Sequence, residues 1–292
     1  MQHTLKKEIS LTGTGLHSGA QVNLTLRPAA AGSGIVFIRT DIRDKDNVIP
    51  ALWDRVVDTR LCTVIANADR VSVGTVEHLM AALRGCAIDN AIVELNGPEV
   101  PVMDGSAEPF VKLIDRAGIQ EQKQSRRAIR VLKEITVEDA GKFARLTPDE
   151  GSVFSGKIDF AHPSIGVQTR EIKLMNGNFR HDIAAARTFG FLHEVETLRR
   201  NGLALGGSLD NAIVLDDVSV LNPDGLRHED EFIRHKLLDA VGDMYLAGAP
   251  LMGAYDGHKA GHALNNALLR KLFATDGAWD SITVSSRTAD TV

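Results

Sequence analysis

The chain has 292 residues, of which 43% are hydrophobic and 24% are charged, and it carries a formal net charge of −5. A chain of this length and composition is expected to fold as a globular protein with one large domain or two of average size. The acidic balance gives no electrostatic reason to expect a nucleic-acid partner, so we predict none.

The sequence carries no sign of export or of membrane insertion. Its N-terminal segment lacks the apolar core of a signal peptide. The uncharged run over 244–255 is far shorter than the ~20 residues that span a bilayer. Only two cysteines occur, Cys62 and Cys86, without CxxC spacing. We therefore expect a cytoplasmic protein in a reducing compartment, without disulfides and without stable membrane insertion.

Residues 1–124 are predicted to form strands first and then a helix, a strand and a second helix. Thr75 is a suitable N-cap for the first helix, and Gly85 is a suitable end. The glycine-rich stretch over 12–19 is predicted to be a turn, and no helical pattern follows it, so a phosphate-binding function for it has little support. The expected elements are strands over 22–26, 35–38 and 89–95, helices over 76–83 and 106–117, and a polar linker over 121–127.

Residues 125–280 are predicted to repeat this order of strands before helices. No capped periodic element is expected after Asp280, and the end of the tail is expected to be disordered. The expected elements are strands over 128–138, 142–147, 153–161 and 210–214, and helices over 182–187, 193–201, 228–247 and 262–273.

A repeated pentapeptide suggests an internal duplication. Residues 210–214 repeat residues 89–93 letter for letter, as Asp-Asn-Ala-Ile-Val. The segment 195–198 precedes the second copy as 76–79 precedes the first, and an Asp-Gly pair followed by a helix comes after each copy. This ordered pattern predicts two similar domains, 1–124 and 125–280, each a mixed α+β unit.

The chemistry-bearing residues do not follow this repeat. In the alignment, Leu113 and Ala117 stand opposite His235 and Asp239, and Thr197 stands opposite His78. A structural function common to both copies cannot explain residues that only one copy carries. We therefore expect a single asymmetric site between the domains.

A column of three polar residues on one helix is the centre of that site. His235, Asp239 and Asp243 follow one another at intervals of four, so they lie on one face of the helix predicted over 228–247. The opposite face is apolar, and a surface helix would keep a charged outer face. We therefore expect the helix to be buried on both sides, where carboxylates need a metal or a hydrogen-bonded partner.

The spacing of His235 and Asp239 is that of two metal ligands on one helix, although such a pair is also common as a surface hydrogen bond. His78 is the best third ligand, because its helix otherwise consists of Leu, Met and Ala. Two histidines and one carboxylate with an open fourth position are typical of catalytic zinc. Glu77 would lie at the edge of that site as a general base.

His262 begins a later helix, and Asp243 is too far along its own helix to be an easy fourth ligand. Such an Asp can hold a catalytic His in one tautomer and raise its pKa. The residues alone therefore predict metal-assisted hydrolysis with a Glu base and a His acid, and they do not indicate the substrate. Two alternatives stay open: a ligand-binding module without catalysis, and a duplicated scaffold with a buried His–Asp pair and no metal.

Seven motifs of the chain occur together in one enzyme family. They are TGTGLHSG (12–19), VEHLMAAL (76–83), PVMDGS (101–106), ARTFGF (186–191), DNAIV (210–214), HKLLDAVGD (235–243) and GHALNN (261–266). Over about residues 4–272 the chain resembles the UDP-3-O-acyl-N-acetylglucosamine deacetylases, the zinc amidases of the committed step of lipid A synthesis in Gram-negative bacteria. No proposed catalytic position departs from the family pattern.

The resemblance implies a function for each matching residue. It implies one zinc ion per chain on His78, His235 and Asp239, with Glu77 as general base. It implies that His262, bonded to Asp243, protonates the leaving amine. Thr188 and Lys236 resemble the residues around the oxyanion, and the positions that match substrate contacts are Leu61, Cys62, Lys142 and Phe189.

The resemblance also implies a fold and an acyl-chain passage. The family fold has two α+β domains, each a five-stranded sheet layered with two helices, and the helices pack between the sheets. The insert at about 191–214 is expected to form an apolar passage for the acyl chain, although a core helix and strand would fit its periodicity equally well. Its candidate contacts are Leu192, Val195, Gly207 and Ser208. The implied partner is an acylated UDP-sugar, and we expect a monomer.

Overall fold

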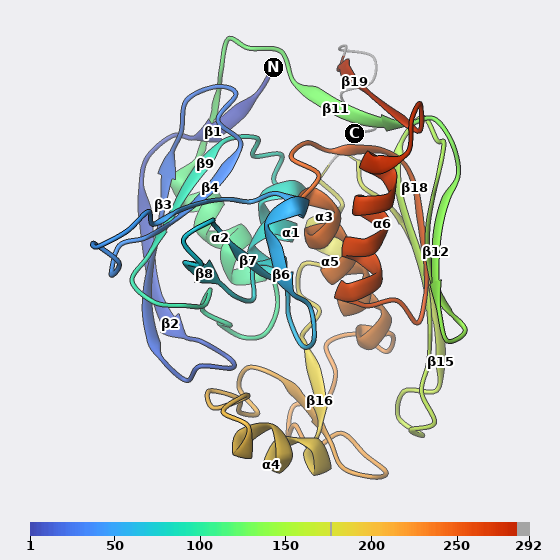
Figure 1. Ribbon diagram of the computed structural model, residues 1–292. Helices are drawn as coiled ribbons and strands as arrows, with labels where there is room; N and C mark the ends of the chain where they lie inside the picture. The colour runs from blue at the N-terminus through green and yellow to red at the C-terminus, as the bar shows by residue number, and fades with distance from the viewer. Residues whose placement is uncertain (176, 285–292) are drawn as a thin grey trace.

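Two large sheets enclose a central layer of helices in the computed structural model, which describes residues 1–175 and 177–284 (Figure 1). The predicted α+β class is confirmed. The expected packing of helices between the sheets is also seen, with α1, α5 and α6 lying between the β2–β4 side and the β12–β18 side of the molecule (Figure 1).

The first half contains a five-stranded sheet of order β2-β3-β9-β4-β5, a small three-stranded sheet β6-β7-β8 and the pair β1-β10. Its elements are β1 (His3–Leu5), β2 (Ile9–Thr14), β3 (Gln21–Pro28), β4 (Ile35–Arg39), β5 (Val48–Pro50), the 3-10 helix η1 (Trp53–Arg55), β6 (Val56–Asp58), β7 (Val64–Ala66), β8 (Ser72–Val73), α1 (Glu77–Gly85), β9 (Ala91–Leu95), α2 (Glu108–Ala117) and β10 (Ile119–Glu121).

The second half contains a seven-stranded sheet and the parallel pair β16-β17. Its elements are β11 (Arg127–Val131), β12 (Ile135–Asp139), β13 (Lys142–Thr147), β14 (Ser152–Asp159), β15 (Val167–Lys173), α3 (Phe179–Asp182), β16 (Phe189–Phe191), α4 (Leu192–Arg200), β17 (Ile213–Leu215), α5 (Glu231–Tyr245), β18 (Leu251–His258), α6 (His262–Ala274) and β19 (Trp279–Thr283).

Five strands of the second sheet repeat the topology of the first. The order β12-β13-β18-β14-β15 has antiparallel, antiparallel, parallel and antiparallel neighbours in turn. The order β2-β3-β9-β4-β5 has the same sequence of pairings. The two further strands, β11 and β19, pair with each other, and β11 joins the sheet at the start of β18. The sheet therefore has seven strands where five were expected.

This shared topology corrects the alignment of the two halves. The strand β9, which contains 91–95, corresponds to β18, because each lies at the centre of its sheet between one antiparallel and one parallel neighbour. Each also follows directly after one of the two central helices, α1 or α5. The second Asp-Asn-Ala-Ile-Val stretch instead ends in β17, outside the large sheet. The helices α1 and α5 therefore correspond, as do α2 and α6. The predicted alignment of His235 with Leu113 and of His78 with Thr197 was therefore wrong.

The helices α1 and α5 pack directly against each other in the centre of the molecule. Every residue of α1 from Glu77 to Arg84 is buried, and so are thirteen of the fifteen residues of α5. A side chain at Gly242 would place its Cβ 2.0 Å from the carbonyl oxygen of Glu77, so only glycine allows this approach. The prediction that the His–Asp–Asp helix is buried on both sides is confirmed.

Several predicted boundaries were wrong for identifiable reasons. Thr75 does not cap α1, because its backbone has a positive φ of 54° and its hydroxyl donates to Glu99. No helix forms over 182–187 beyond α3: the chain continues in turns, the Ala184 carbonyl accepts from Ala107 N–H, and Arg187 N–H donates to Glu231. Three other segments contain unexpected strand: β2 enters the predicted turn at 12–14, β10 and β11 enter the linker, and β19 extends past Asp280.

The strand prediction for the second half was incomplete, and the prediction for the end of the tail is not tested. The predicted strand over 128–138 is divided into β11 and β12, and β15 and β18 were not predicted. The C-terminal part of the tail, 285–292, lies outside the described residues. Within the described part of the chain, no helix is both long enough and apolar enough to cross a bilayer.

Candidate metal centre

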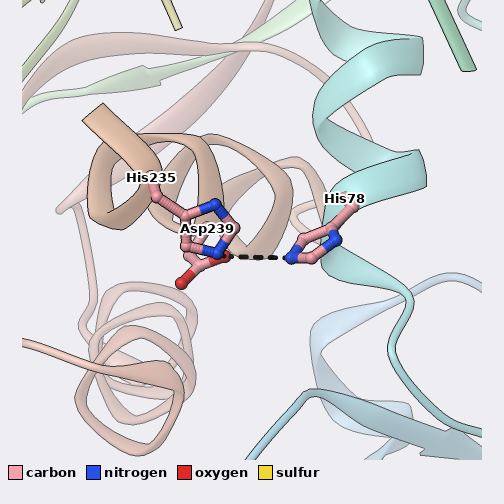
Figure 2. A group of neighbouring side chains, drawn as sticks. All are labelled: His78, His235 and Asp239. Carbon is pink, nitrogen blue, oxygen red and sulfur yellow. Dashed lines mark ion pairs between the residues drawn. The ribbon is translucent and has the colours of Figure 1, made fainter. Parts of the chain in front are cut away.

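The two central helices bring three potential metal ligands together. His78 projects from α1 toward His235 and Asp239 on α5 (Figure 2). Nε2 of His235 lies 3.3 Å and Nε2 of His78 lies 3.5 Å from Oδ1 of Asp239. All three ligand atoms lie within 4.8 Å of one another, and all three residues are buried. The structure therefore contains a His/His/Asp cluster that could bind a metal ion.

The hydrogen bonds around the cluster leave the ligand atoms free. Nδ1 of His235 donates to the carbonyl of Ala186 at 3.0 Å, so its Nε2 carries the lone pair. Lys236 donates to Oδ2 of Asp239 at 3.1 Å, whereas Oδ1 is buried without a hydrogen-bond partner among the described residues. A buried carboxylate oxygen between two imidazole nitrogens needs a cation. The donor set therefore fits a divalent metal.

The ionisation of His235 and Asp239 is consistent with such a site. Burial lowers the pKa of His235 to about 4, so its imidazole is neutral at physiological pH and able to coordinate. The pKa of Asp239 lies well below its usual range: burial opposes this shift, but the electrostatic interactions with His235 and with the charged Lys236 outweigh it. Neutral imidazole and ionised carboxylate are the forms that bind metal.

Glu77 lies beside the cluster with its carboxylate held from one side. The backbone N–H of Thr63 donates to Oε2 of Glu77 at 3.0 Å. Burial raises the pKa of Glu77, and the attraction of His262 and His78 only partly opposes this. A carboxylate with a raised pKa at the edge of a metal site is suited to accept a proton.

His262 faces Glu77 across the site from the first position of α6. Its Nε2 lies 4.0 Å from Oε1 of Glu77, and its Nδ1 donates to Oδ2 of Asp243 at 2.8 Å. Burial alone would lower its pKa, but the Asp243 carboxylate raises the pKa of His262 to about 9. The imidazole is therefore protonated at neutral pH, with Nε2–H directed into the site.

Two residues that bond to Asp243, and a third that bonds to one of them, were not predicted from the sequence. The hydroxyl of Thr63 donates to Oδ1 at 2.6 Å, and the amide of Asn265 donates to Oδ2 at 2.8 Å. Tyr255 in turn donates to Asn265 at 2.7 Å. Asn265 could have been suspected, since it lies one turn after His262 on the same helix. Thr63 gave no such signal, because it reaches the site from the connection before β7.

A polar cavity of about 390 Å³ opens over the cluster. Most of the residues predicted as catalytic or substrate-binding line it, so elements of both halves contribute to one space. The predicted residues in its wall are Glu77, His78, His235, Asp239, His262, Thr188, Lys236, Leu61, Cys62, Lys142 and Phe189. Of the predicted catalytic residues, Asp243 alone lies behind this wall, bonded to His262.

A second cavity of about 480 Å³ shares part of that wall and is more apolar. It is enclosed by Val64, Gly74 and Pro98 of the first half and by Leu198, Gly202 and Leu203 of the insert. The predicted insert contacts Leu192, Val195, Gly207 and Ser208 line neither of these two cavities, and Leu192 is exposed. Their contact with substrate stays a prediction.

The sequence is similar to one family of enzymes over nearly its whole length. Residues 2–274 match the sequence model of the UDP-3-O-acyl N-acetylglycosamine deacetylase family. Three curated relatives carry the name UDP-3-O-acyl-N-acetylglucosamine deacetylase. The protein of Idiomarina loihiensis is 50% identical over 99% of this chain and 94% of its own length. That of Chromobacterium violaceum is 51% identical over 96% and 92%, and that of Phenylobacterium zucineum is 49% identical over 100% and 99%.

Proposed function

The chain belongs to the UDP-3-O-acyl N-acetylglycosamine deacetylase family, and from this premise we propose that it is a zinc-dependent amidohydrolase of lipid A biosynthesis. It hydrolyses the 2-acetamido group of a UDP-3-O-(3-hydroxyacyl)-N-acetylglucosamine to acetate and the free amine. The observation that carries this proposal is the convergence of three metal ligands with a buried Glu and a protonated His on one cavity.

One zinc ion per chain would be held by His78, His235 and Asp239. Two imidazoles and one carboxylate with an open position are the donor set of catalytic zinc sites. When bound, the ion supplies Lewis acidity toward the acetamide carbonyl and toward a water molecule. Lys236, bonded to Oδ2 of Asp239, keeps the other carboxylate oxygen turned toward the two imidazoles.

Glu77 and His262 divide the proton transfers between them. Glu77 accepts the proton of the attacking water, since burial raises its pKa and Thr63 fixes its orientation. His262, charged because Asp243 raises its pKa, donates a proton to the leaving nitrogen. Thr188 lies in the cavity wall, where its hydroxyl can donate to the developing oxyanion.

The two adjoining cavities suit the two ends of an acylated UDP-sugar. Lys142, Phe189, Leu61 and Cys62 surround the polar cavity, where we place the sugar nucleotide. The apolar cavity, which extends toward α4, suits the acyl chain. We further propose that the protein works as a monomer in the cytoplasm of a Gram-negative bacterium, on a substrate that it binds without inserting into the membrane.

Metal analysis paired with a deacetylation assay tests the proposal. Chelator-treated protein is expected to lose both zinc and activity and to regain both when about one zinc per chain is restored. His262→Ala should then lower turnover by about 10²-fold or more while zinc content stays near one per chain.

Each rival function predicts a different result of the same experiment. A binding module without catalysis would show no deacetylation in the zinc-restored wild type. A metal-free scaffold would take up no stoichiometric zinc. Loss of zinc together with activity in His262→Ala would move this residue into the ligand set.

A further inference from the structure

His17 is a residue of the site for which the proposed chemistry has no use. It lies in the turn that follows β2, and it is a lining residue of both the polar and the apolar cavity. Both ring nitrogens are buried, and neither has a hydrogen-bond partner among the described residues. Burying a polar group without a partner is unfavourable, so such groups usually serve a ligand or a water.

The backbone of His17 is fixed from two sides. Its N–H donates to Oε1 of Glu99 at 2.9 Å, and its carbonyl accepts from the N–H of Leu205 in the insert at 3.2 Å. Glu99 is itself buried and also accepts from Ser18 N–H and the Thr75 hydroxyl. The ring is therefore carried on a rigid turn between the first half and the insert.

Four residues line both cavities, namely His17, Arg60, Leu61 and Cys62. Arg60 is exposed and paired with Asp58, and Leu61 has no polar side-chain atom. Burial raises the pKa of the Cys62 thiol to about 12, which leaves it a weak neutral donor. His17 is thus the strong neutral hydrogen-bonding group at this junction.

His17 is also in the protonation state that suits an uncharged ligand oxygen. Burial lowers its pKa, and the positive charge of His262 acts in the same direction against the attraction of Glu99. The neutral imidazole has one N–H donor and one acceptor nitrogen. A neutral donor at a partly closed junction matches a carbonyl better than it matches a phosphate.

In a 3-O-acylated sugar nucleotide, the ester is the group that connects the polar sugar to the apolar chain. A substrate that fills both cavities must place that ester where the cavities meet. Resting on the proposed function, we propose that the ring N–H of His17 donates a hydrogen bond to the carbonyl oxygen of the 3-O-acyl ester. His17 thereby selects acylated substrates and sets the position of the acetamide over the metal cluster.

The test compares an ester with an ether. Wild type, His17→Phe, His17→Leu and His17→Gln are assayed on the 3-O-acyl substrate and on a 3-O-alkyl analogue of equal chain length, which lacks the carbonyl. The apolar variants should lower kcat/KM about tenfold on the ester and leave it unchanged on the ether, because only the ester loses a hydrogen bond. His17→Gln, which keeps an N–H donor, should recover part of the loss.

An equal loss on ester and ether in both apolar variants would overturn the inference, as would full ester activity in His17→Leu and His17→Phe. His181→Gln, at an exposed histidine of α3, is the matched control and should change neither substrate. Melting temperature and zinc content of each variant detect misfolding directly. A wild type that deacetylates neither compound would instead refute the proposed function, so the two failures are distinguishable.

Discussion

The two halves of the molecule share a backbone plan but differ in the chemistry that they carry. In both, four strands of the shared five-strand order precede an insert, a helix, the central strand and a second helix. In the first half, α1 supplies Glu77 and His78, and α2 supplies no residue of the site. In the second half, α5 supplies His235, Asp239 and Asp243, and α6 begins with His262.

The inserts lie at the same topological position in each half and have diverged furthest. Between β5 and α1 lies the small sheet β6-β7-β8, and between β15 and α5 lie α3, α4 and the pair β16-β17. Both contribute to the cavities, through the 59–62 connection on one side and Thr188, Phe189 and the α4 region on the other. We propose that a duplication with its junction at about residue 124 produced the two sheets. The two inserts then diverged and acquired residues that line the cavities.

The largest effect should come from removing a ligand from either half. His78→Ala and His235→Ala are each expected to lose stoichiometric zinc and to lower activity more than about 10²-fold, since even outer-shell partners of metal ligands matter by about 10- to 100-fold. Metal content after dialysis and the deacetylation rate provide the measurement.

Lys112→Ala, at an exposed residue of α2, is the control and should change neither quantity. Retention of one tightly bound zinc in His78→Ala would show that the second half alone makes the site.

A smaller loss of activity should follow from removing the Asp243 carboxylate that is bonded to His262, the proposed general acid. Asp243 raises the pKa of His262 to about 9, so wild-type kcat/KM should fall as pH rises through about 9, where the acid loses its proton. In Asp243→Asn, burial is no longer opposed by this charge, and the alkaline limb should move to lower pH. Activity at pH 8 should drop about 10- to 100-fold.

The pH profile of kcat/KM measures this shift, because it follows the free enzyme. Asp256→Asn on β18 removes an ion pair with Arg145 and should leave the limb in place. An unchanged alkaline limb in Asp243→Asn would mean that His262 is not the acid.

The smallest effect concerns the contact between the halves. In Gly242→Ala the new methyl group would meet the Glu77 carbonyl at 2.0 Å, so α1 and α5 must separate. Overpacking of this kind costs about 1–3 kcal/mol. Thermal unfolding should show a lower melting temperature, and zinc titration should show weaker binding.

Gly190→Ala meets no atom within 4 Å and serves as the control. A stable Gly242→Ala variant with unchanged zinc affinity would mean that the helix contact does not set the ligand geometry.

The sequence predicted local periodicity well and long-range correspondence poorly. The burial of α5 followed from its two-sided pattern, because apolar spacing and the lack of any charge but the two Asps after Lys236 are properties of one segment. His78 and Glu77 were predicted as site residues because polar side chains are unusual in a helix that otherwise consists of Leu, Met and Ala. The repeated Asp-Asn-Ala-Ile-Val sequence, by contrast, led to an alignment of β9 with β17. The structural counterpart of β9 is β18, which has the same position in its sheet but a different sequence.

Contacts between residues that are far apart in the sequence could not be predicted from local patterns. Thr63 donates to both Glu77 and Asp243, yet nothing near it in the chain differs from an ordinary connection. Thr75 matched a helix cap by residue type, but the attraction of Glu99 holds it in another backbone conformation. The positions of Leu198 and Leu203, rather than Leu192, on the apolar cavity depend on how α4 and the turn after it are oriented.

The hydrogen bond between Thr63 and Asp243 joins residues 180 positions apart, and it has a consequence for how the protein is made. At a synthesis rate of about 5–20 residues per second, roughly 10 to 40 s separate the appearance of these two residues. During that interval α1 has no α5 to cover it, so the face of α1 that packs on α5 in the folded protein stays uncovered on the nascent chain. The helix that carries Glu77 and His78 therefore reaches its final packing only after most of the chain has been synthesised.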